Sequence, residues 1–289
     1  MLLKAFAKIN WSLDIVGVRP DGYHLLDMVM QPVSLADDII LLPDRNLSIE
    51  TDGYPYSASD STNLAYKAAE CLRAYCGIKQ GVRILLHKRI PIGAGLGGGS
   101  ADAAAVLWGL NRLWKLNIAS EQLESIGLSI GADVPFCLRG GLTRTRGIGE
   151  NLENCLCSMN YRLLVIQPCR GLSTGAVFSA WHSSADIRHP DTDSVLKALA
   201  TGNHELLSSS VYNVLEGISS SECPEIAEAI NRLLDSGAFT ALMTGSGSAV
   251  FGAFRSGAAA EKAMKKLSSR YRTIHLCHTQ TDSIRVMEE

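Results

Sequence analysis

The feature that most constrains this chain is a glycine-rich segment near position 95. Five of the seven residues from Gly93 to Gly99 are glycine, between a strand-like stretch (Val82–Ile90) and a helix-like stretch (Ser100–Trp114). Glycine loses conformational entropy on folding, so this density suits a backbone with positive φ or in close contact with a ligand. A turn opening into a helix also presents unpaired N–H groups beside the positive end of the helix dipole. The segment therefore predicts an anion-binding loop rather than an ordinary tight turn.

Most well-known phosphate loops do not fit the segment. A Walker A loop requires lysine before the final serine or threonine, whereas glycine precedes Ser100. Gly93, Gly95 and Gly98 satisfy the spacing of a dinucleotide-binding turn, but a helical pattern stands where that motif needs a second strand and an acidic residue. No His-Arg-Asp or Asp-Phe-Gly motif of protein kinases occurs, and the surroundings of Ser100 do not form a nucleophile elbow.

Composition and net charge limit the classes of binding partner that the chain can have. The chain has 289 residues, 46% of them hydrophobic and 19% charged, which predicts a globular protein of one or two domains. Lys and Arg number 27 against 29 Asp and Glu, so no broad basic field exists to hold nucleic acid or an acidic membrane, and we expect neither partner. The longest uncharged window, Ser236–Phe254, contains four glycines and is typical of strand, turn and strand. No targeting segment is recognisable, and we expect a soluble, cytoplasmic protein.

Cysteine and histidine spacing predicts no metal site built by the protein. The chain has eight cysteines and seven histidines. No cysteine pair has the two-residue spacing of a zinc or redox motif, and no histidine pair has helical ligand spacing. We therefore expect the cysteines to be free thiols that pack as small hydrophobes.

Periodicity predicts an α+β fold of two domains, because strands and helices alternate without a regular βαβ repeat. The domain boundary is expected within Asn151–Asn160, giving domains 1–155 and 156–289. The expected strands are Ala5–Val18, Ile39–Leu42, Leu47–Thr51, Val82–Ile90, Tyr161–Gln167, Ala238–Met243, Ala249–Phe254 and Thr273–His278. The expected helices are Ser61–Cys76 (capped by Ser61 or Thr62), Ser100–Trp114, Ser120–Ile130, Ser194–Ala200, His204–Leu215, Pro224–Asp235 and Gly257–Ser269.

Three motifs together resemble a known superfamily. The segment Pro91–Ala101 is similar to the ATP-phosphate loop of the GHMP small-molecule kinases, and Ala7–Asn10 and Met243–Ala249 resemble the other two motifs of these enzymes. The motifs occur in order and span nearly the whole chain, so the sequence is identified as a member of this superfamily. One departure is Phe6, where the family usually has proline, but the lysine and asparagine that follow are intact.

The resemblance implies a two-domain GHMP kinase fold. Its N-terminal domain resembles ribosomal protein S5 domain 2 and carries ATP and the catalytic groups, and its ferredoxin-like C-terminal domain binds substrate. ATP is the implied co-substrate, with Mg²⁺ carried on it, and the implied substrate is a small alcohol. Pro20–His24 and Gly131–Phe136 are similar to the branch whose substrate bears a cytidine diphosphate group. The protein would be a monomer or homodimer.

Alternatives to that reading remain open. A GHMP kinase for another alcohol, such as homoserine, would share the phosphate loop but lack cytidine selectivity. A nucleotide-binding module that has lost its chemistry would also keep the loop, although Lys8 and Asp133 are both present. A dinucleotide oxidoreductase is the third alternative.

The resemblance also assigns catalytic roles. Asp133 would be the general base that takes the proton from the substrate hydroxyl, and Lys8 beside it would keep the carboxylate ionised. Without the resemblance, Asp133 is typical of a turn residue and Lys8 of a solvated strand face. Asn10 lies on the same strand face as Lys8 and would hydrogen-bond the substrate near its hydroxyl.

The remaining implied contacts belong to two binding sites. The ATP-binding residues would be Asn63, Lys88, Pro91, Gly93, Gly95, Leu96, Gly97, Gly98, Gly99 and Ser100, with Asn63 and Lys88 at the nucleoside end. The substrate-binding residues, beside Asn10, would be Tyr23, His24, Thr174, Phe178, Gly245 and Ser246. Tyr23 and Phe178 would stack on the cytosine and His24 would hydrogen-bond it. Asp102, in the first turn of the helix, is not assigned to a metal because a carboxylate there often only complements the helix dipole.

Overall fold

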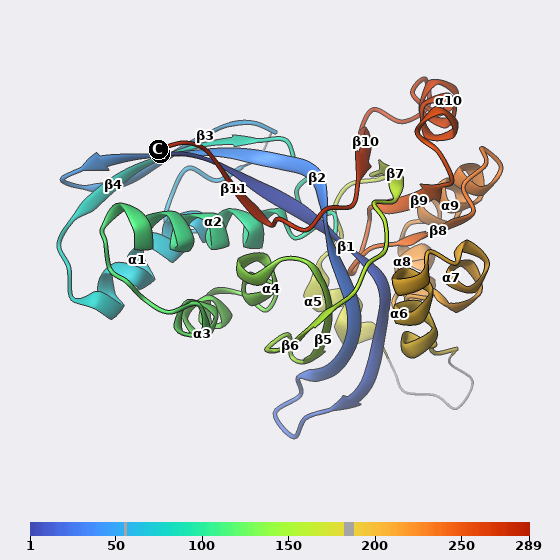
Figure 1. The fold of residues 1–289 in the computed structure, drawn as a ribbon, viewed down its shortest axis with the longest axis horizontal. Helices are drawn as coiled ribbons and strands as arrows, with labels where there is room; N and C mark the ends of the chain where they lie inside the picture. The colour runs from blue at the N-terminus through green and yellow to red at the C-terminus, as the bar shows by residue number, and fades with distance from the viewer. Residues whose placement is uncertain (55–56, 182–187) are drawn as a thin grey trace.

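The computed structural model describes residues 1–54, 57–181 and 188–289. Its strands form two sheets flanked by helices (Figure 1). The first sheet has seven strands: β1 (Leu2–Val18), β2 (His24–Asp44), β3 (Leu47–Gly53), β4 (Gly81–Lys88), β5 (Leu142–Gly147), β6 (Asn151–Cys155) and β11 (Ile284–Glu288). The second has four: β7 (Arg162–Ile166), β8 (Thr240–Met243), β9 (Val250–Phe254) and β10 (Ile274–His278). This is the expected α+β class with the two-sheet fold of the GHMP kinases.

Ten helices complete the described chain. Those between β3 and β5 are α1 (Leu64–Cys76), α2 (Gly98–Leu113), α3 (Ser120–Ile130) and α4 (Val134–Arg139), and they lie along one face of the first sheet (Figure 1). The others are α5 (Thr174–Ala180), α6 (Thr192–Thr201), α7 (His204–Ser210), α8 (Glu216–Glu222), α9 (Glu225–Leu234) and α10 (Gly257–Leu267).

The β1–β2 hairpin joins the two halves of the molecule. Strand β1 pairs with β2 along most of its length, and an isolated parallel bridge links Leu13 to Asn213 in the second half. Both faces of β1 are covered: Leu3 packs against α2 and Leu13 belongs to the same core farther along the strand, whereas Ile9 packs in a second core with the other sheet. The expectation of a solvated face for Lys8, read from the strand alone, is therefore wrong, since Lys8 is 3% exposed.

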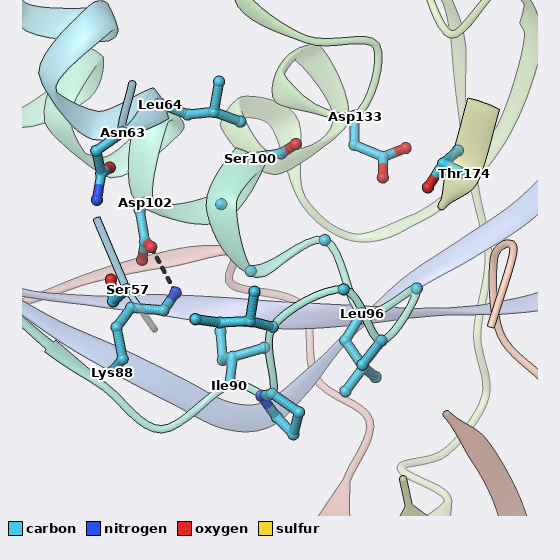
Figure 2. Close-up of a pocket in the computed structure, with 18 of the residues that line it drawn as sticks. Ser57, Asn63, Leu64, Lys88, Ile90, Leu96, Ser100, Asp102, Asp133 and Thr174 are labelled. Carbon is cyan, nitrogen blue, oxygen red and sulfur yellow. Dashed lines mark hydrogen bonds and ion pairs between the residues drawn. The ribbon is translucent and has the colours of Figure 1, made fainter. Parts of the chain in front are cut away.

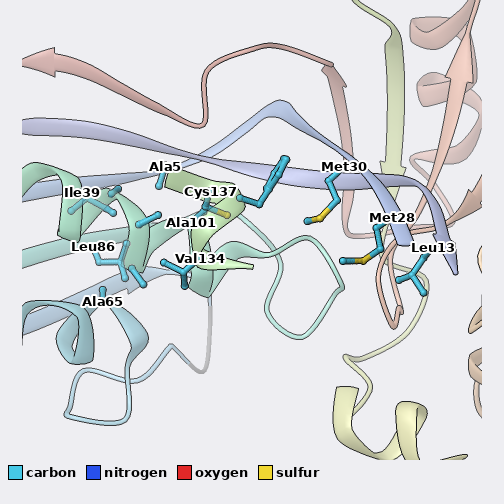
Figure 3. Close-up of a cluster of buried hydrophobic side chains, with 14 of the residues drawn as sticks. Ala5, Leu13, Met28, Met30, Ile39, Ala65, Leu86, Ala101, Val134 and Cys137 are labelled. Atoms are coloured by element: carbon cyan, nitrogen blue, oxygen red, sulfur yellow. The ribbon is translucent and has the colours of Figure 1, made fainter. Parts of the chain in front are cut away.

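The main core fills the space between the first sheet and its helices. Figure 3 shows Ala101 and Val134 near Ala5, with Met28 and Leu13 farther along the hairpin. Helix α2 can lie close to the sheet because its first turns are rich in alanine: Ala101, Ala103, Ala104 and Ala105 are all buried. This close packing fixes where the glycine-rich segment meets the helix.

Several sequence expectations differ from the structure. Ile39–Leu42 is part of the long strand β2, and helix α1 is capped by the side chain of Asn63, which accepts from Ala65 N, rather than by Ser61 or Thr62. The expected helix His204–Leu215 stops at Ser210, because Asn213 donates to the carbonyls of Met243 and Gly245 (3.0 and 2.8 Å) instead of continuing a helix. The strand β11 was not expected, and it pairs with β1.

Two further observations concern the cysteines and the membrane. Cys169 and Cys223 form a disulfide, so the expectation of eight free thiols is wrong for this pair, which is brought together by the fold from positions 54 residues apart. Among the described residues, none of the helices has the length and apolar character needed to cross a bilayer.

Candidate active site

The glycine-rich segment forms a loop from the end of β4 to the start of α2. Gly93, Gly95 and Gly97 have φ values of 65°, 73° and 69°, a region that other L-residues rarely adopt. A Cβ on Gly95 would overlap the carbonyl oxygen of Thr244, and one on Gly97 would lie 3.0 Å from Lys8 Cγ. Positive φ and close approach of other segments therefore both require glycine in this loop.

The three motifs identified from sequence meet at this loop. The backbone N–H of Lys8 donates to Leu96 O (3.0 Å), and that of Ala249 donates to Ala94 O (3.0 Å). The side chain of Lys8 donates to Gly95 O (2.8 Å). Segments from near both ends of the chain thus fix the loop's conformation.

The loop borders a cavity of about 470 Å³. Figure 2 shows Ser57, Asn63, Lys88 and Asp102 gathered at one end, and Asp133 and Thr174 at the other. The cavity is lined by all ten residues predicted to bind ATP, Asn63, Lys88, Pro91, Gly93, Gly95, Leu96, Gly97, Gly98, Gly99 and Ser100, together with Ser57, Ala58, Leu64, Ile90, Ile92, Ala94, Asp102, Asp133 and Thr174. The free N–H groups of the first turn of α2 open onto the same space, which makes it suited to polyphosphate.

Lys8 and Asp133 form a pair beside the loop. Lys8 Nζ lies 3.7 Å from Asp133 Oδ2, and the lysine side chain is 4% exposed whereas the aspartate side chain is 31% exposed. Asp133 directly precedes α4, yet within the described chain its carboxylate caps none of that helix's N–H groups. The buried cation is thus fixed while the carboxylate faces the cavity, the arrangement required of a base held next to a positive charge.

Asn10 holds this pair and the third motif in place. It is fully buried, and its Oδ1 accepts from Lys8 Nζ (2.8 Å), Gly245 N (3.0 Å) and Thr244 Oγ1 (3.3 Å). In this arrangement Asn10 orients Lys8. The structure thus adds a positioning role for Asn10, and its contact with substrate stays a prediction.

At the opposite end of the cavity, Lys88 is part of a buried cluster of three charged side chains. Its Nζ is hydrogen-bonded to Asp37 Oδ2 and to Asp102 Oδ2 (2.6 Å). Burial disfavours the ammonium, but the two carboxylates outweigh it and raise the pKa of Lys88. Burial raises the pKa of Asp102 well above its ordinary value, and Lys88 offsets this only in part. Lys88 thus lines the cavity while bound to two carboxyl groups, and its nucleoside contact stays a prediction.

Asn63 is similarly engaged. Its Oδ1 accepts from Ala65 N (2.9 Å) as the cap of α1, and its Nδ2 donates to Ala58 O (2.8 Å). Asn63 thus shapes the same end of the cavity as Lys88, and its remaining amide hydrogen is available to a ligand.

A second group of side chains lies around the tip of the β1–β2 hairpin. The ring of His24 lies 5.4 Å from that of Phe178 and 5.5 Å from that of Trp181. Tyr23 is 62% exposed, with Arg19 over its ring. The structure thus brings His24 and Phe178 together as expected, while Trp181 was missed. Trp181 directly follows the end of α5 and has an extended backbone, so helical spacing from Phe178 could not have identified it.

Thr174 and the third motif (Met243–Ala249) border the cavity from the C-terminal half of the chain. Thr174 Oγ1 is hydrogen-bonded to Ser246 Oγ (2.9 Å), and the carbonyl of Ser246 accepts from Ser219 Oγ (3.0 Å). Ser246 is buried and Gly245 has a φ of 57°, so both shape the loop that contacts Gly95. Among the described residues, no group of three or more His, Cys, Asp or Glu side chains could hold a metal ion.

Comparison with known proteins agrees with this geometry. Residues 63–141 match the GHMP kinases N terminal domain family, and residues 195–273 match the GHMP kinases C terminal family. The fold and the glycine-rich loop thus define a GHMP kinase, an ATP-dependent small-molecule kinase.

The relatives narrow the class further. A 4-diphosphocytidyl-2-C-methyl-D-erythritol kinase of Clostridium tetani is 41% identical over 280 residues, and the match covers 96% of this chain and 100% of the relative. A solved structure of 4-(cytidine 5'-diphospho)-2C-methyl-D-erythritol kinase is 35% identical with a TM-score of 0.82, covering 96% of this chain and 99% of that one. A homoserine kinase structure from Cytophaga hutchinsonii shares the fold (TM-score 0.78, coverage 99% and 97%) at 18% identity. The chain belongs to the 4-diphosphocytidyl-2-C-methyl-D-erythritol kinase family.

Proposed function

We propose that this protein transfers the γ-phosphoryl group of ATP to the 2-hydroxyl of 4-diphosphocytidyl-2-C-methyl-D-erythritol, a step of non-mevalonate isoprenoid precursor biosynthesis. Membership of the kinase family supports the reaction. The observation that carries the mechanism is the Lys8–Asp133 pair at 3.7 Å, placed at one end of a cavity lined by the glycine-rich loop.

In this mechanism, the loop and the first turn of α2 bind the phosphates through backbone N–H groups. Asp133 accepts the proton of the substrate hydroxyl as that oxygen attacks the γ-phosphorus. Lys8 stabilises the carboxylate and the developing charge, and Asn10 fixes the direction of the lysine side chain. Phosphoryl transfer requires little covalent chemistry from the protein, so positioning and charge supply most of the rate enhancement.

Magnesium would enter with ATP. The cavity offers the hydroxyl oxygen of Ser100 beside the loop, a ligand of the type that Mg²⁺ prefers, so the residues present fit an ion that arrives bound to ATP and leave Asp133 free as the base. When bound, it would neutralise phosphate charge during transfer.

The substrate's base would lie by the hairpin tip. Tyr23, His24 and Phe178 offer aromatic faces and ring nitrogens suited to a flat polar base. Thr174 lines the same cavity as Asp133 and is hydrogen-bonded to Ser246, so Thr174, Gly245 and Ser246 would border the diphosphate and erythritol portions.

The domain arrangement and assembly follow as further proposals. Residues 1–155 would supply the ATP site and catalytic pair, and residues 156–289 would complete the substrate site, with β11 returning to the first sheet. A monomer or homodimer in the cytoplasm, where ATP is available, is the form we propose. Light scattering of the purified protein would determine the assembly state.

The decisive experiment measures ADP release from ATP and Mg²⁺ with the cytidine-bearing substrate, beside homoserine and mevalonate. Turnover with the cytidine substrate alone supports the proposal. Turnover with a control alcohol alone would keep the kinase chemistry but overturn the substrate. ATP binding without turnover of any alcohol would indicate a non-catalytic module.

A further inference from the structure

Beneath the glycine-rich loop lies the buried cluster of Asp37, Lys88 and Asp102, which the reaction above does not use. The three residues are 0%, 5% and 2% exposed, and they come from β2, the end of β4 and α2. Because α2 begins at Gly98, Asp102 lies beyond its first turn, and the expectation that it complements the helix dipole there is wrong. Two carboxylates share one ammonium, so the cluster holds an unusual concentration of charge for a protein interior. Such a cluster calls for an explanation beyond stability, because buried ion pairs are often no more stabilising than apolar packing.

Asp37 binds the point at which the chain leaves the sheet. Its Oδ1 accepts from the backbone N–H groups of Arg89 (2.5 Å) and Ile90 (2.8 Å), the two residues between β4 and Pro91. Its other oxygen is bonded to Lys88 Nζ. One carboxylate therefore uses both oxygens to fix the start of the loop.

Lys88 extends this connection to the end of the loop. Its Nζ donates to Asp102 Oδ2 (2.6 Å) on α2, just beyond the first turn of that helix, as the dashed line in Figure 2 shows. A Cβ on Gly98 would stand 3.4 Å from Lys88 Nζ and 2.8 Å from Ile90 Cγ2, so the ammonium lies directly against the loop backbone. Both ends of the loop are thus joined through a single lysine.

Lys88 is the cation that offsets the burial of Asp102, because its other charged neighbour in the cluster, Asp37, is a carboxyl that raises the pKa of Asp102 further. Within the described residues Asp102 Oδ1 is buried and has no hydrogen-bond partner, while Oδ2 is bonded to Lys88. Burying a carboxylate with one oxygen unpartnered costs free energy of folding. The hydrogen bond to Lys88 is the interaction that offsets this cost.

We infer that Asp37, Lys88 and Asp102 are positioning residues for ATP: they clamp the two ends of the glycine-rich loop so that its N–H groups converge on the phosphates before ATP arrives. This inference rests on the proposed function, because it deepens the role of the loop as the ATP site. Preorganisation of this kind increases affinity by lowering the entropy lost on binding. The clamp lies at the nucleoside end of the cavity, away from Thr174 and the substrate side (Figure 2). It therefore acts on ATP and not on the alcohol.

The test compares steady-state KM values for the two substrates. Asp37→Asn keeps the side-chain shape but cannot accept on both oxygens, so the KM for ATP rises about tenfold or more while the KM for the cytidine substrate stays within about twofold. Asp38→Asn is the matched control: the neighbouring carboxylate pairs with Lys4 and Arg89 on the partly exposed face of the strand, and both KM values stay within about twofold.

A second pair of variants covers the case in which Asp37→Asn does not fold. Asp102→Ala removes the bond to Lys88 and raises the KM for ATP, whereas Asp102→Asn can still accept that bond and restores most of the ATP affinity. A merely structural role would lower the unfolding temperature of both variants without separating the two KM values.

The outcomes distinguish this inference from the proposed function. Folded variants with unchanged KM for ATP, or with equal changes for both substrates, would overturn the clamp. If the wild-type protein binds ATP in calorimetry but turns over no alcohol, the proposed function fails, and the ATP affinities of the same variants still decide the clamp. A wild-type protein that does not bind ATP would overturn both.

Discussion

The ammonium of Lys8 lies 3.7 Å from the Asp133 carboxylate, although one residue is in the first strand and the other precedes α4. The lysine is held from behind by Asn10 Oδ1 and Gly95 O, both at 2.8 Å. Two oxygens, one from β1 and one from the glycine-rich loop, therefore hold the cation, whereas the carboxylate keeps a free face toward the cavity. This asymmetry is what a general base beside a fixed charge requires.

Asp133→Asn should lower kcat by about two to four decades, because an amide of the same shape cannot accept the substrate proton. The KM for ATP should change little, since the loop N–H groups remain in place. Steady-state kinetics with both substrates measures this. The exposed Asp193, paired with Arg144 on the surface, provides a control, Asp193→Asn, that should keep wild-type rates. A loss below about tenfold in Asp133→Asn would favour a mechanism without a base.

Gly97→Ala should impair both the loop and the catalytic lysine. Gly97 has a φ of 69°, and a Cβ there would lie 3.0 Å from Lys8 Cγ and 3.2 Å from Lys8 Cε. An L-residue in this conformation costs about 1 kcal/mol, and the crowding displaces Lys8 from Asp133. We expect kcat to fall by about tenfold or more, because small displacements at a reacting centre are costly.

The control for this variant is Gly257→Ala at the start of α10, where nothing among the described atoms lies within 4 Å of the added Cβ. It should retain wild-type kcat and unfolding temperature. Equal behaviour of the two alanine variants would mean that Gly97 is replaceable and that the close approach to Lys8 has no catalytic consequence.

Much of this site was predictable from local sequence. The glycine density, the helix that follows it and the periodicity of β1 identified the phosphate loop and placed Lys8 and Asn10 on one strand face. The pairing of Lys8 with Asp133 came only from the resemblance to GHMP kinases, because no local pattern relates residues so far apart. That prediction of proximity agrees with the ion pair in the structure, while its catalytic role stays a prediction.

What sequence could not predict depends on tertiary contacts. Asp37 looks like an ordinary carboxylate beside Asp38, and only the pairing of β2 with β4 brings it to the N–H groups of Arg89 and Ile90. Asn213 ends α7 early through bonds to the third motif, which no helix propensity encodes. The strand β11 was missed because its partner β1 is at the opposite end of the chain.

Tyr23→Ala should raise the KM for the cytidine substrate by about tenfold and leave the KM for ATP unchanged, because an aromatic face lost from a base-stacking site costs on the order of 1 kcal/mol beyond its buried area. Tyr75→Ala is matched in residue type and exposure, since Tyr23 is 62% and Tyr75 57% exposed. Tyr75 lies on α1, so its variant should be kinetically silent. If Tyr23→Ala changes neither KM, a kinase whose alcohol substrate carries no nucleobase would be favoured.

Phe178→Ala should have the same selective effect from the opposite side of the cleft, because its ring lies 5.4 Å from that of His24. Trp181, whose ring lies 5.5 Å from that of His24, should contribute by fixing the position of the imidazole. A rise in the KM for ATP instead would contradict the placement of the base at the hairpin tip. Calorimetric titration with cytidine diphosphate provides the direct measurement.

Glu216→Gln should stabilise the fold at neutral pH. Burial raises the pKa of Glu216 above its usual value, and the backbone N–H of Met243 and the charge of Arg188 offset this only in part. A carboxyl whose pKa is raised by folding contributes most stability below its unfolded pKa of 4.5, and that contribution is lost as the pH rises through the higher folded value. Glutamine avoids this loss and still accepts from Met243 N, which is 2.9 Å from Glu216 Oε2. Thermal unfolding should therefore give a higher midpoint for the variant at pH 7, and the difference should disappear as the pH falls below about 4.5.

The control is Glu222→Gln at an exposed position, which should show no such difference in unfolding midpoint. If Glu216→Gln is instead less stable than the wild type at pH 7, the charge of Glu216 itself supports the segment Met243–Ala249.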